Sequence, residues 1–145
     1  STQQDTLSTQ WTIDHVTERY LDDLPDDPQW VDGSGLSRYN MQTPRTMVAL
    51  LLKVDSLLGD ARIRTIFPAG GVSGTVEDWY ASPDRQPYVF AKTGSLGGKH
   101  CLSGFLYTRS GKKLIFSFMH NNFVTSSSVF KVEMEHILRQ IYEKY

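Results

Sequence analysis

The sequence predicts an α+β fold: helices and loops come first, a three-stranded antiparallel meander follows, and one helix closes the chain. Three observations predict it. Apolar residues recur at helical spacing before residue 60. Three β-rich runs then follow residue 87, with no helical stretch between them. A last amphipathic stretch ends the sequence, and this order is typical of an α+β chain rather than of alternating parallel βαβ units.

The composition indicates one domain with a hydrophobic core. The chain has 145 residues, of which 39% are hydrophobic and 12% aromatic, which suits a single domain. It carries 15 lysines and arginines against 16 aspartates and glutamates, so its charge gives no reason to expect nucleic acid or an anionic membrane as a partner. We expect helices and loops mainly in residues 1–87, and the strands and the last helix in residues 88–145.

The first predicted element is an amphipathic helix over residues 11–24. Its apolar residues lie at near-helical spacing, with acidic residues between them: Trp11, Ile13, Val16, Tyr20, Leu21 and Leu24. Pro25 and Pro28 end this helix, and the Asp-Gly-Ser-Gly segment at 32–35 predicts a loop. Residues 1–9 are polar, and we expect them to be frayed.

Thr43 and Pro44 predict the start of a second helix. The threonine hydroxyl can accept from the first-turn amides, and proline at the first helical position loses no hydrogen bond. Apolar residues from Met47 to Leu58 cover most of the helix circumference, which predicts burial against more than one neighbour. We expect this helix to end at Gly59, and the glycines and prolines of residues 60–87 to form short turns and loops.

The period of the sequence changes after residue 87. Residues 88–96, 101–108 and 113–121 are β-rich, and the Arg-Ser-Gly-Lys segment at 109–112 predicts a turn between the last two runs. The three runs predict an antiparallel meander. The serines at 126–128 can cap a final helix whose apolar face lies on the sheet.

One tripeptide carries a chemical signal. Lys92-Thr93-Gly94 ends the first predicted strand and continues into Ser95. A Lys-Thr-Gly tripeptide alone is weak evidence, but here a hairpin and a closing helix follow it. That order is the one in which serine acyltransferases of the penicillin-binding class use the motif.

Other segments complete a resemblance to a known family. They are Asp-Gly-Ser-Gly-Leu-Ser-Arg-Tyr-Asn at 32–40, Thr-Pro at 43–44, Pro-Ala-Gly-Gly at 68–71 with Gly-Thr at 74–75, and Ala-Lys-Thr-Gly-Ser-Leu at 91–96 with Leu-Ser-Gly-Phe at 102–105. In this order they resemble the D-alanyl-D-alanine carboxypeptidase/endopeptidase family, the class C low-molecular-mass penicillin-binding proteins. The resemblance runs from about residue 30 to 122.

The resemblance implies a partial domain, the C-terminal part of a penicillin-binding transpeptidase-like (serine β-lactamase-like) fold. It implies that Lys92 and Thr93 hold the terminal carboxylate of a peptidoglycan stem peptide or a β-lactam, since a cation and a hydroxyl suit that group. Gly94 would leave the strand clear for the substrate backbone to pair alongside, and the Ser95 amide would be one of two oxyanion donors. No cofactor is implied, and the location would be the periplasm or cell envelope.

The family also uses a Ser-x-x-Lys nucleophile and a Ser-x-Asn motif, both before the loop at 32–40. We therefore expect both before residue 1, in the N-terminal part of the same protein, and expect this segment alone to be inactive. Ser110 and Ser128 begin Ser-x-x-Lys matches, but the first lies in a predicted turn and we interpret the second as part of a helix start. The segment from Ser37 to Asn40 has one residue too many for Ser-x-Asn. A non-catalytic peptide-binding or assembly module is the alternative function.

Three further expectations concern partners and side chains. The family sheet has five strands, so the run at 113–121 would be left as an open edge, and we predict self-association through it. His15, His100, His120, His136 and Cys101 show no metal-ligand spacing, so we expect no metal. We expect Lys99 and His100 to be solvated after the turn at 97–98, and Arg38 to bind a neighbouring carbonyl or carboxylate.

Overall fold

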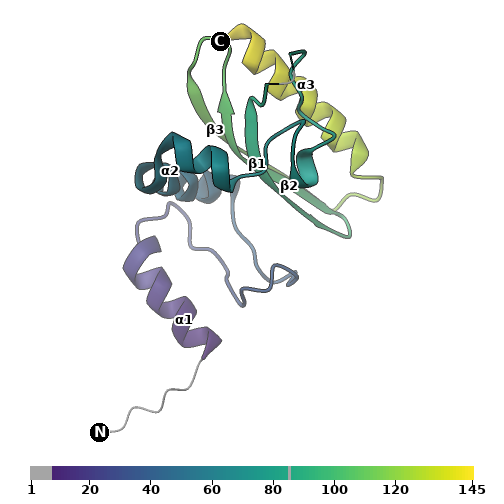
Figure 1. Cartoon of the computed structure of the whole chain (residues 1–145). Coiled ribbons are helices and arrows are strands. Elements are labelled where there is room, and N and C mark those ends of the chain that lie inside the picture. The colour runs from purple at the N-terminus through teal and green to yellow at the C-terminus, as the bar shows by residue number, and fades with distance from the viewer. Residues whose placement is uncertain (1–7, 85) are drawn as a thin grey trace, which may run out of the picture.

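The computed structural model describes residues 8–84 and 86–145 (Figure 1). In chain order, its elements are α1 (Thr9–Val16), the π-helical turn η1 (Thr17–Leu21), α2 (Pro44–Ile66), the 3-10 turn η2 (Gly74–Val76), β1 (Val89–Leu96), β2 (Lys99–Tyr107), β3 (Lys113–Asn121) and α3 (Ser128–Lys144). In these described residues the strands form an antiparallel sheet in the order β1-β2-β3. The predicted α+β class and three-stranded meander are confirmed.

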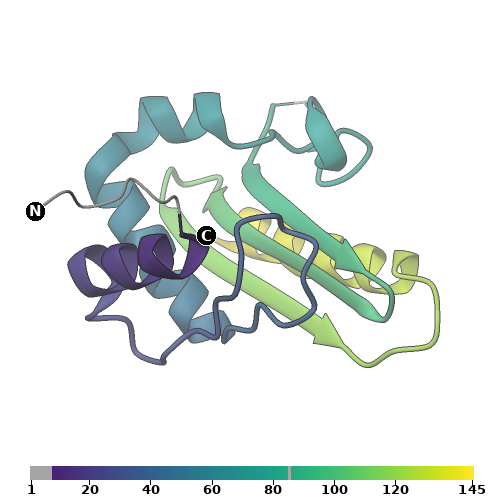
Figure 2. The same cartoon turned by 90° about the horizontal axis from the view of Figure 1, so that it is seen from below.

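The sheet lies between α2 and α3, and the side chains of β1 alternate between the two helices. Val89 and Ala91 join an apolar cluster that contains Met134 of α3. Phe90, between them, joins a second cluster that contains Ile63 of α2. Figures 1 and 2 show the two helices on opposite faces of the sheet. The alternation therefore assigns each residue of β1 to one face.

The closing helix α3 lies on the sheet as predicted, with Met134 and Leu138 buried. Its start differs in detail from the expected cap. Ser127 is the N-cap residue, but its side chain makes no capping hydrogen bond. Instead, the hydroxyl of Ser126 accepts from the amide of Ser128 at 3.3 Å, so the serine run closes the turn before the helix.

The start of α2 is the predicted one, but its end is not. The hydroxyl of Thr43 accepts from the amide of Thr46 at 3.1 Å, and Pro44 is the first helical residue. The prediction that the helix ends at Gly59 is wrong. Gly59 breaks the helical geometry with a φ of 69°, which glycine adopts without steric cost, and the helix then resumes as far as Ile66.

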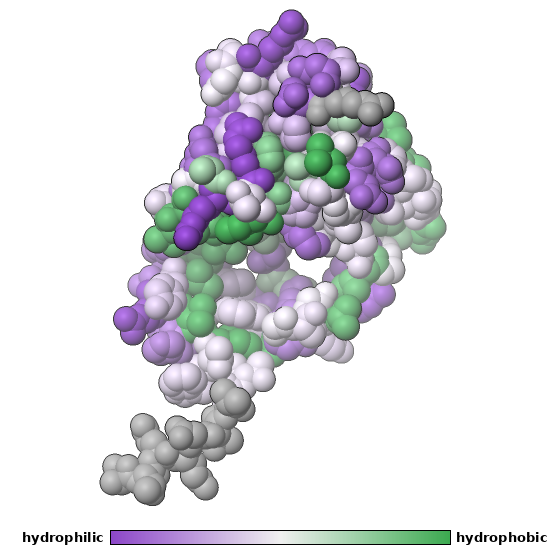
Figure 3. Space-filling model, viewed as in Figure 1, coloured by the Kyte–Doolittle hydropathy of each residue, from purple (hydrophilic) through white to green (hydrophobic). Residues whose placement is uncertain are grey.

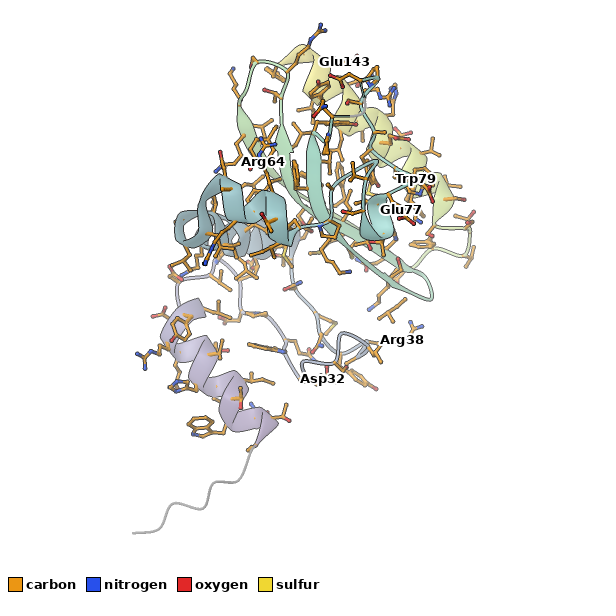
Figure 4. All side chains as sticks on the ribbon, viewed as in Figure 1. Asp32, Arg38, Arg64, Glu77, Trp79 and Glu143 are labelled. Carbon is orange, nitrogen blue, oxygen red and sulfur yellow. The ribbon has the colours of Figure 1, made fainter. Side chains whose placement is uncertain are left out.

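Contacts distant in sequence hold the resumed part of α2 on the sheet. The ammonium of Lys113, the first residue of β3, binds the carboxylates of Asp55 at 2.5 Å and Asp60 at 2.6 Å, one on each side of the break. Beyond it, the guanidinium of Arg64, which Figure 4 labels, approaches the sheet; it lies 3.7 Å from the ring centre of Tyr107. These contacts explain why a glycine that ends many helices only interrupts this one.

The apolar residues of α2 are only partly covered. Leu52 is 55% exposed and Leu57 is 81% exposed, and Figure 3 shows hydrophobic side chains at the surface beside the hydrophilic ones. The predicted burial of α2 against more than one neighbour is confirmed in part: Thr46 is 1% exposed and donates to the carbonyl of Asp26 at 3.2 Å, whereas the two leucines remain exposed. The helix packs one side against the sheet, and the segment before it covers a further part of its surface.

The N-terminal helix starts earlier and ends sooner than predicted. The hydroxyl of Ser8 accepts from the amide of Trp11 at 3.3 Å and caps α1, which begins at Thr9. The expected fraying of residues 1–9 is thus wrong for residues 8 and 9, whereas residues 1–7 lie outside the description. Helical backbone ends at Leu21 rather than at residue 24. No helix in the described ranges is long and apolar enough to cross a bilayer.

Candidate active site

One edge of β1 is partly covered by a loop. The amide of Ala91 donates to the carbonyl of Pro68 at 3.0 Å, and the amide of Gly70 donates to the carbonyl of Val89 at 2.9 Å. Backbone groups of a strand point alternately to its two sides. The backbone amides and carbonyls of Thr93 and Ser95 therefore point to the same side of β1 as those of Val89 and Ala91, but lie beyond the part that the loop covers. This open edge of β1 runs along the Lys-Thr-Gly motif.

Lys92 lies on the sheet face that carries α2, beyond the apolar cluster formed there. Its side chain is exposed, and its cross-strand partner is Ser103. The hydroxyl of Ser103 is in turn 2.8 Å from that of Ser117 on β3. The ammonium of Lys92 donates to the carbonyl oxygen of Thr93 at 2.6 Å. A cation and a short row of hydroxyls thus follow the apolar part of this face.

Thr93 is held by a residue of the η2 turn. Its hydroxyl oxygen lies 2.6 Å from that of Thr75. The loop that brings η2 here crosses the chain closely: a Cβ on Gly70 would lie 2.8 Å from the carbonyl oxygen of Tyr80. The Pro-Ala-Gly-Gly segment therefore permits a close backbone crossing that places Thr75 beside the motif. The sequence pattern included Thr75, but gave it no partner.

Gly94 and Gly104 both belong to the family pattern, but the structure explains the need for glycine differently at the two positions. A Cβ on Gly104 would lie 2.3 Å from the carbonyl oxygen of Phe90, so packing within the sheet demands glycine there. A Cβ on Gly94 would come no closer than 4.0 Å to Cys101, an ordinary contact distance. Packing within the described residues therefore does not require Gly94. Its lack of a side chain leaves open space on the strand beside Lys92.

Ser95 is paired with a buried histidine. Its hydroxyl lies 2.8 Å from Nδ1 of His100, and the two residues are opposite each other on β1 and β2. His100 is 0% exposed, so the expectation that it is solvated is wrong. The alternation of β2 places His100 on the face of the buried Leu102, toward α3. Extending that alternation back from Leu102 would have revealed this from the sequence.

The surroundings of His100 favour its neutral form. Burial lowers the pKa of this imidazole below its ordinary value, and the positive charge of Lys131 and the nearby His120 lower it further. His120 lies opposite His100 on β3, and its ring stacks on Phe130 of α3 with centroids 4.5 Å apart. Ser95 therefore faces an uncharged imidazole.

The loop at 32–40 is an ordered structure built on one carboxylate. Asp32 accepts from the hydroxyl of Ser34 at 2.9 Å and from the side-chain amide of Asn40 at 3.1 Å, and these bonds lower the pKa of Asp32. Arg38 then donates to the carbonyl of Gly97 at 3.0 Å. The prediction that Arg38 binds a neighbouring carbonyl is confirmed, and Figure 4 shows Arg38 and Asp32 on this loop. The loop is thus tied to the turn between β1 and β2.

The two Ser-x-x-Lys matches show no features of a nucleophile. The hydroxyl of Ser110 lies 3.2 Å from that of Thr108 in the turn before β3. The hydroxyl of Ser128 lies 2.8 Å from that of Ser126 at the start of α3. Neither bond involves a lysine. In the described part of the chain, no group of three or more His, Cys, Asp or Glu residues could hold a metal ion.

Comparisons with known proteins point in one direction. The family model described as D-Ala-D-Ala carboxypeptidase 3 (S13) matches residues 26–141. D-alanyl-D-alanine carboxypeptidase DacB of Haemophilus influenzae is 38% identical over 96 residues, which are 65% of this chain and 20% of that protein. The chain thus spans about a fifth of the length of this curated relative.

Solved structures resemble the chain as well. Penicillin binding protein 4 (dacB) from Haemophilus influenzae matches with a TM-score of 0.77 and 26% identity, over 92% of this chain and 31% of that one. The same protein complexed with a β-lactam matches with a TM-score of 0.70 and 29% identity, over 81% of this chain and 29% of that one. Sequence and structure therefore identify the same relatives.

Proposed function

Because the chain belongs to the D-Ala-D-Ala carboxypeptidase 3 (S13) family, we propose that it is the C-terminal segment of a serine-type D-Ala-D-Ala carboxypeptidase. The whole protein would cleave peptidoglycan stem peptides through an acyl-serine, and its N-terminal part would supply the serine. The observation that carries the proposal is the exposed Lys92 beside the open edge of β1. This segment would provide the substrate anchor and one oxyanion donor.

In the proposed binding step, Lys92 and Thr93 hold the terminal carboxylate. The ammonium of Lys92 is bonded to the carbonyl of Thr93, and it can turn to the stronger charge-assisted bond that a carboxylate offers. The hydroxyl of Thr75 can donate to that of Thr93, since either can be the donor. The proton of Thr93 is then free for the carboxylate, so Thr75 would orient the anchor.

The substrate backbone would pair with the open edge of β1 as an added strand. The serine oxygen attacks the carbonyl carbon of the penultimate D-Ala and forms an ester, and the terminal D-Ala leaves with a proton on its nitrogen. Water then hydrolyses the ester. The Ser95 amide, which alternation points to this edge, would stabilise the oxyanion in both steps, and loss of such a donor costs about 10²–10³ in rate.

The proposal also covers partners and location. β-Lactams would acylate the same serine, and the relative whose structure holds a β-lactam supports this. The exposed Leu52 and Leu57 of α2 and the open edge of β3 would contact the N-terminal part of the protein. Because its substrate is the cell wall, the protein would act in the periplasm or cell envelope.

The test is covalent labelling with a fluorescent penicillin. We expect the whole protein to be labelled, this segment alone to remain unlabelled, and Lys92→Ala to slow labelling by about tenfold or more, as loss of a charged hydrogen bond predicts. Lys112→Ala is the matched control, because Lys112 lies in the turn between β2 and β3 and contacts the ring of Tyr145. Stem-peptide binding by a whole protein that no penicillin labels would instead favour the non-catalytic module.

A further inference from the structure

His100 is a buried polar residue whose burial packing alone does not explain. Its side chain is 0% exposed, yet its one hydrogen bond among the described residues is to the hydroxyl of Ser95. Its other ring nitrogen, Nε2, is buried without a hydrogen-bond partner in the same residues. Burying a polar atom without a partner is unfavourable. An apolar residue would fill the position without that cost. The bond to Ser95 is therefore what histidine provides here and an apolar residue would not.

The bond between Ser95 and His100 lies near the turn that joins β1 and β2. Ser95 and His100 form the last cross-strand pair but one, and only Leu96 with Lys99 lies between them and the turn. The turn contains Gly98 with a φ of 71°. The end of a hairpin is where a strand pair opens most easily. The side-chain bond therefore joins β1 and β2 where the Ser95 amide meets the open edge.

We propose that His100 is a positioning residue, which fixes the orientation of the Ser95 backbone amide by holding the Ser95 hydroxyl. This inference rests on the proposed role of that amide as an oxyanion donor. An oxyanion donor acts through its preorganised direction, so a pinned Ser95 is a better donor than one at a fraying strand end. His100 itself touches neither substrate nor nucleophile.

The residues around His100 favour the neutral imidazole that this role needs. Its partner on β3 is His120, whose ring is stacked on Phe130 of α3. Lys131 supplies a positive charge from the same helix. A neutral imidazole in this setting can accept a hydrogen bond from the Ser95 hydroxyl at Nδ1. That bond holds the ring in place between the sheet and α3.

The experiment compares variants in the whole protein by their second-order rate of acylation by a penicillin. His100→Asn can place an amide group near the Nδ1 position and should keep most of the rate. His100→Phe should lower the rate by about tenfold, less than the 10²–10³ expected when a donor is lost outright. Ser95→Ala should lower it equally, and the double variant should be no slower than either, because both changes remove the same bond.

Several outcomes would overturn this inference. One is an unchanged rate in His100→Phe; another is a double variant whose loss is the product of the single losses. A third is an equal loss in His100→Asn and His100→Phe with equal unfolding temperatures, which would show that a hydrogen-bonding group near the Nδ1 position does not preserve the rate. Should His100→Phe fail to fold, the exposed Ser95 carries the test, and an unchanged rate in Ser95→Ala contradicts the inference. If the unaltered protein is not acylated at all, the proposed function fails, and this inference fails with it.

Discussion

The ammonium of Lys92 donates a hydrogen bond to the carbonyl oxygen of Thr93, its neighbour in the chain, at 2.6 Å. By the alternation of β1, that carbonyl points to the open edge of the sheet. The ion pairs formed within the described residues involve Arg45, Lys53 and Lys113 rather than Lys92. The Lys92 ammonium is thus held at the strand edge by a neutral carbonyl, and the carboxylate of a bound substrate would take the place of that carbonyl as its acceptor.

Thr93→Val in the whole protein tests the hydroxyl half of the anchor. Valine keeps the shape of threonine but cannot donate to a carboxylate, and a hydrogen bond to a charged group contributes about 1.5–3 kcal/mol. We expect kcat/KM for a peptide ending in D-Ala-D-Ala to fall by about tenfold or more. Thr93→Ser is the control and should keep most activity. Equal activity of the valine and serine variants would remove Thr93 from the anchor.

The two glycines of β1 and β2 should respond oppositely to alanine. Gly104→Ala forces a Cβ against the carbonyl oxygen of Phe90 at 2.3 Å, and such overpacking costs about 1–3 kcal/mol of unfolding free energy. Gly94→Ala meets nothing closer than 4.0 Å and should leave stability unchanged or slightly raised. Urea unfolding of this segment measures both. Comparable losses in the two variants would show that Gly94 is also required by packing.

The buried His100 predicts a pH dependence of stability. Its pKa is lowered in the folded state, first by burial and then by Lys131 and His120, whereas in the unfolded chain it lies near 6.5. As pH falls below about 6.5, the unfolded state therefore binds more protons, and the unfolding free energy decreases. Urea unfolding at pH 7.5 and 5.5 should show this decrease, and His100→Phe should reduce it. An equal decrease in the variant would assign the effect to other groups.

The open edge of β3 predicts self-association of the isolated segment. The strand pairs with β2 on one side, and unpaired strand edges recruit other chains. Sedimentation equilibrium should show dimers or larger species at high protein concentration, and Leu114→Lys, which adds a charge on β3, should shift the population toward monomer. A strictly monomeric segment near crystallisation concentrations would contradict this prediction.

The sequence predicted the parts of the fold that local patterns determine. The strands follow from period and turn residues, and Thr43 and Pro44 determine the start of α2 through contacts within one turn. The continuation past Gly59 could not be predicted in this way, because Lys113, more than fifty residues away, binds the carboxylates on both sides of the break.

The candidate site likewise combines residues that local patterns predict with contacts that depend on distant parts of the chain. The order of motifs singled out Lys92 and Thr93, but the hydroxyl pair with Thr75 depends on a loop crossing that no local pattern encodes. The expectation that His100 is solvated is wrong: a polar residue after a glycine turn usually is, but the alternation of β2 turns this one toward α3 and buries it.

The central claim is that the edge at Lys92 holds the terminal carboxylate of the substrate. A crystal structure of the whole protein acylated by a penicillin tests it most directly. The account predicts the penicillin carboxylate within about 3 Å of the Lys92 ammonium and the Thr93 hydroxyl, with the acyl oxygen accepting from the Ser95 amide. A carboxylate bound by other groups, with Lys92 still donating to the carbonyl of Thr93, would contradict it.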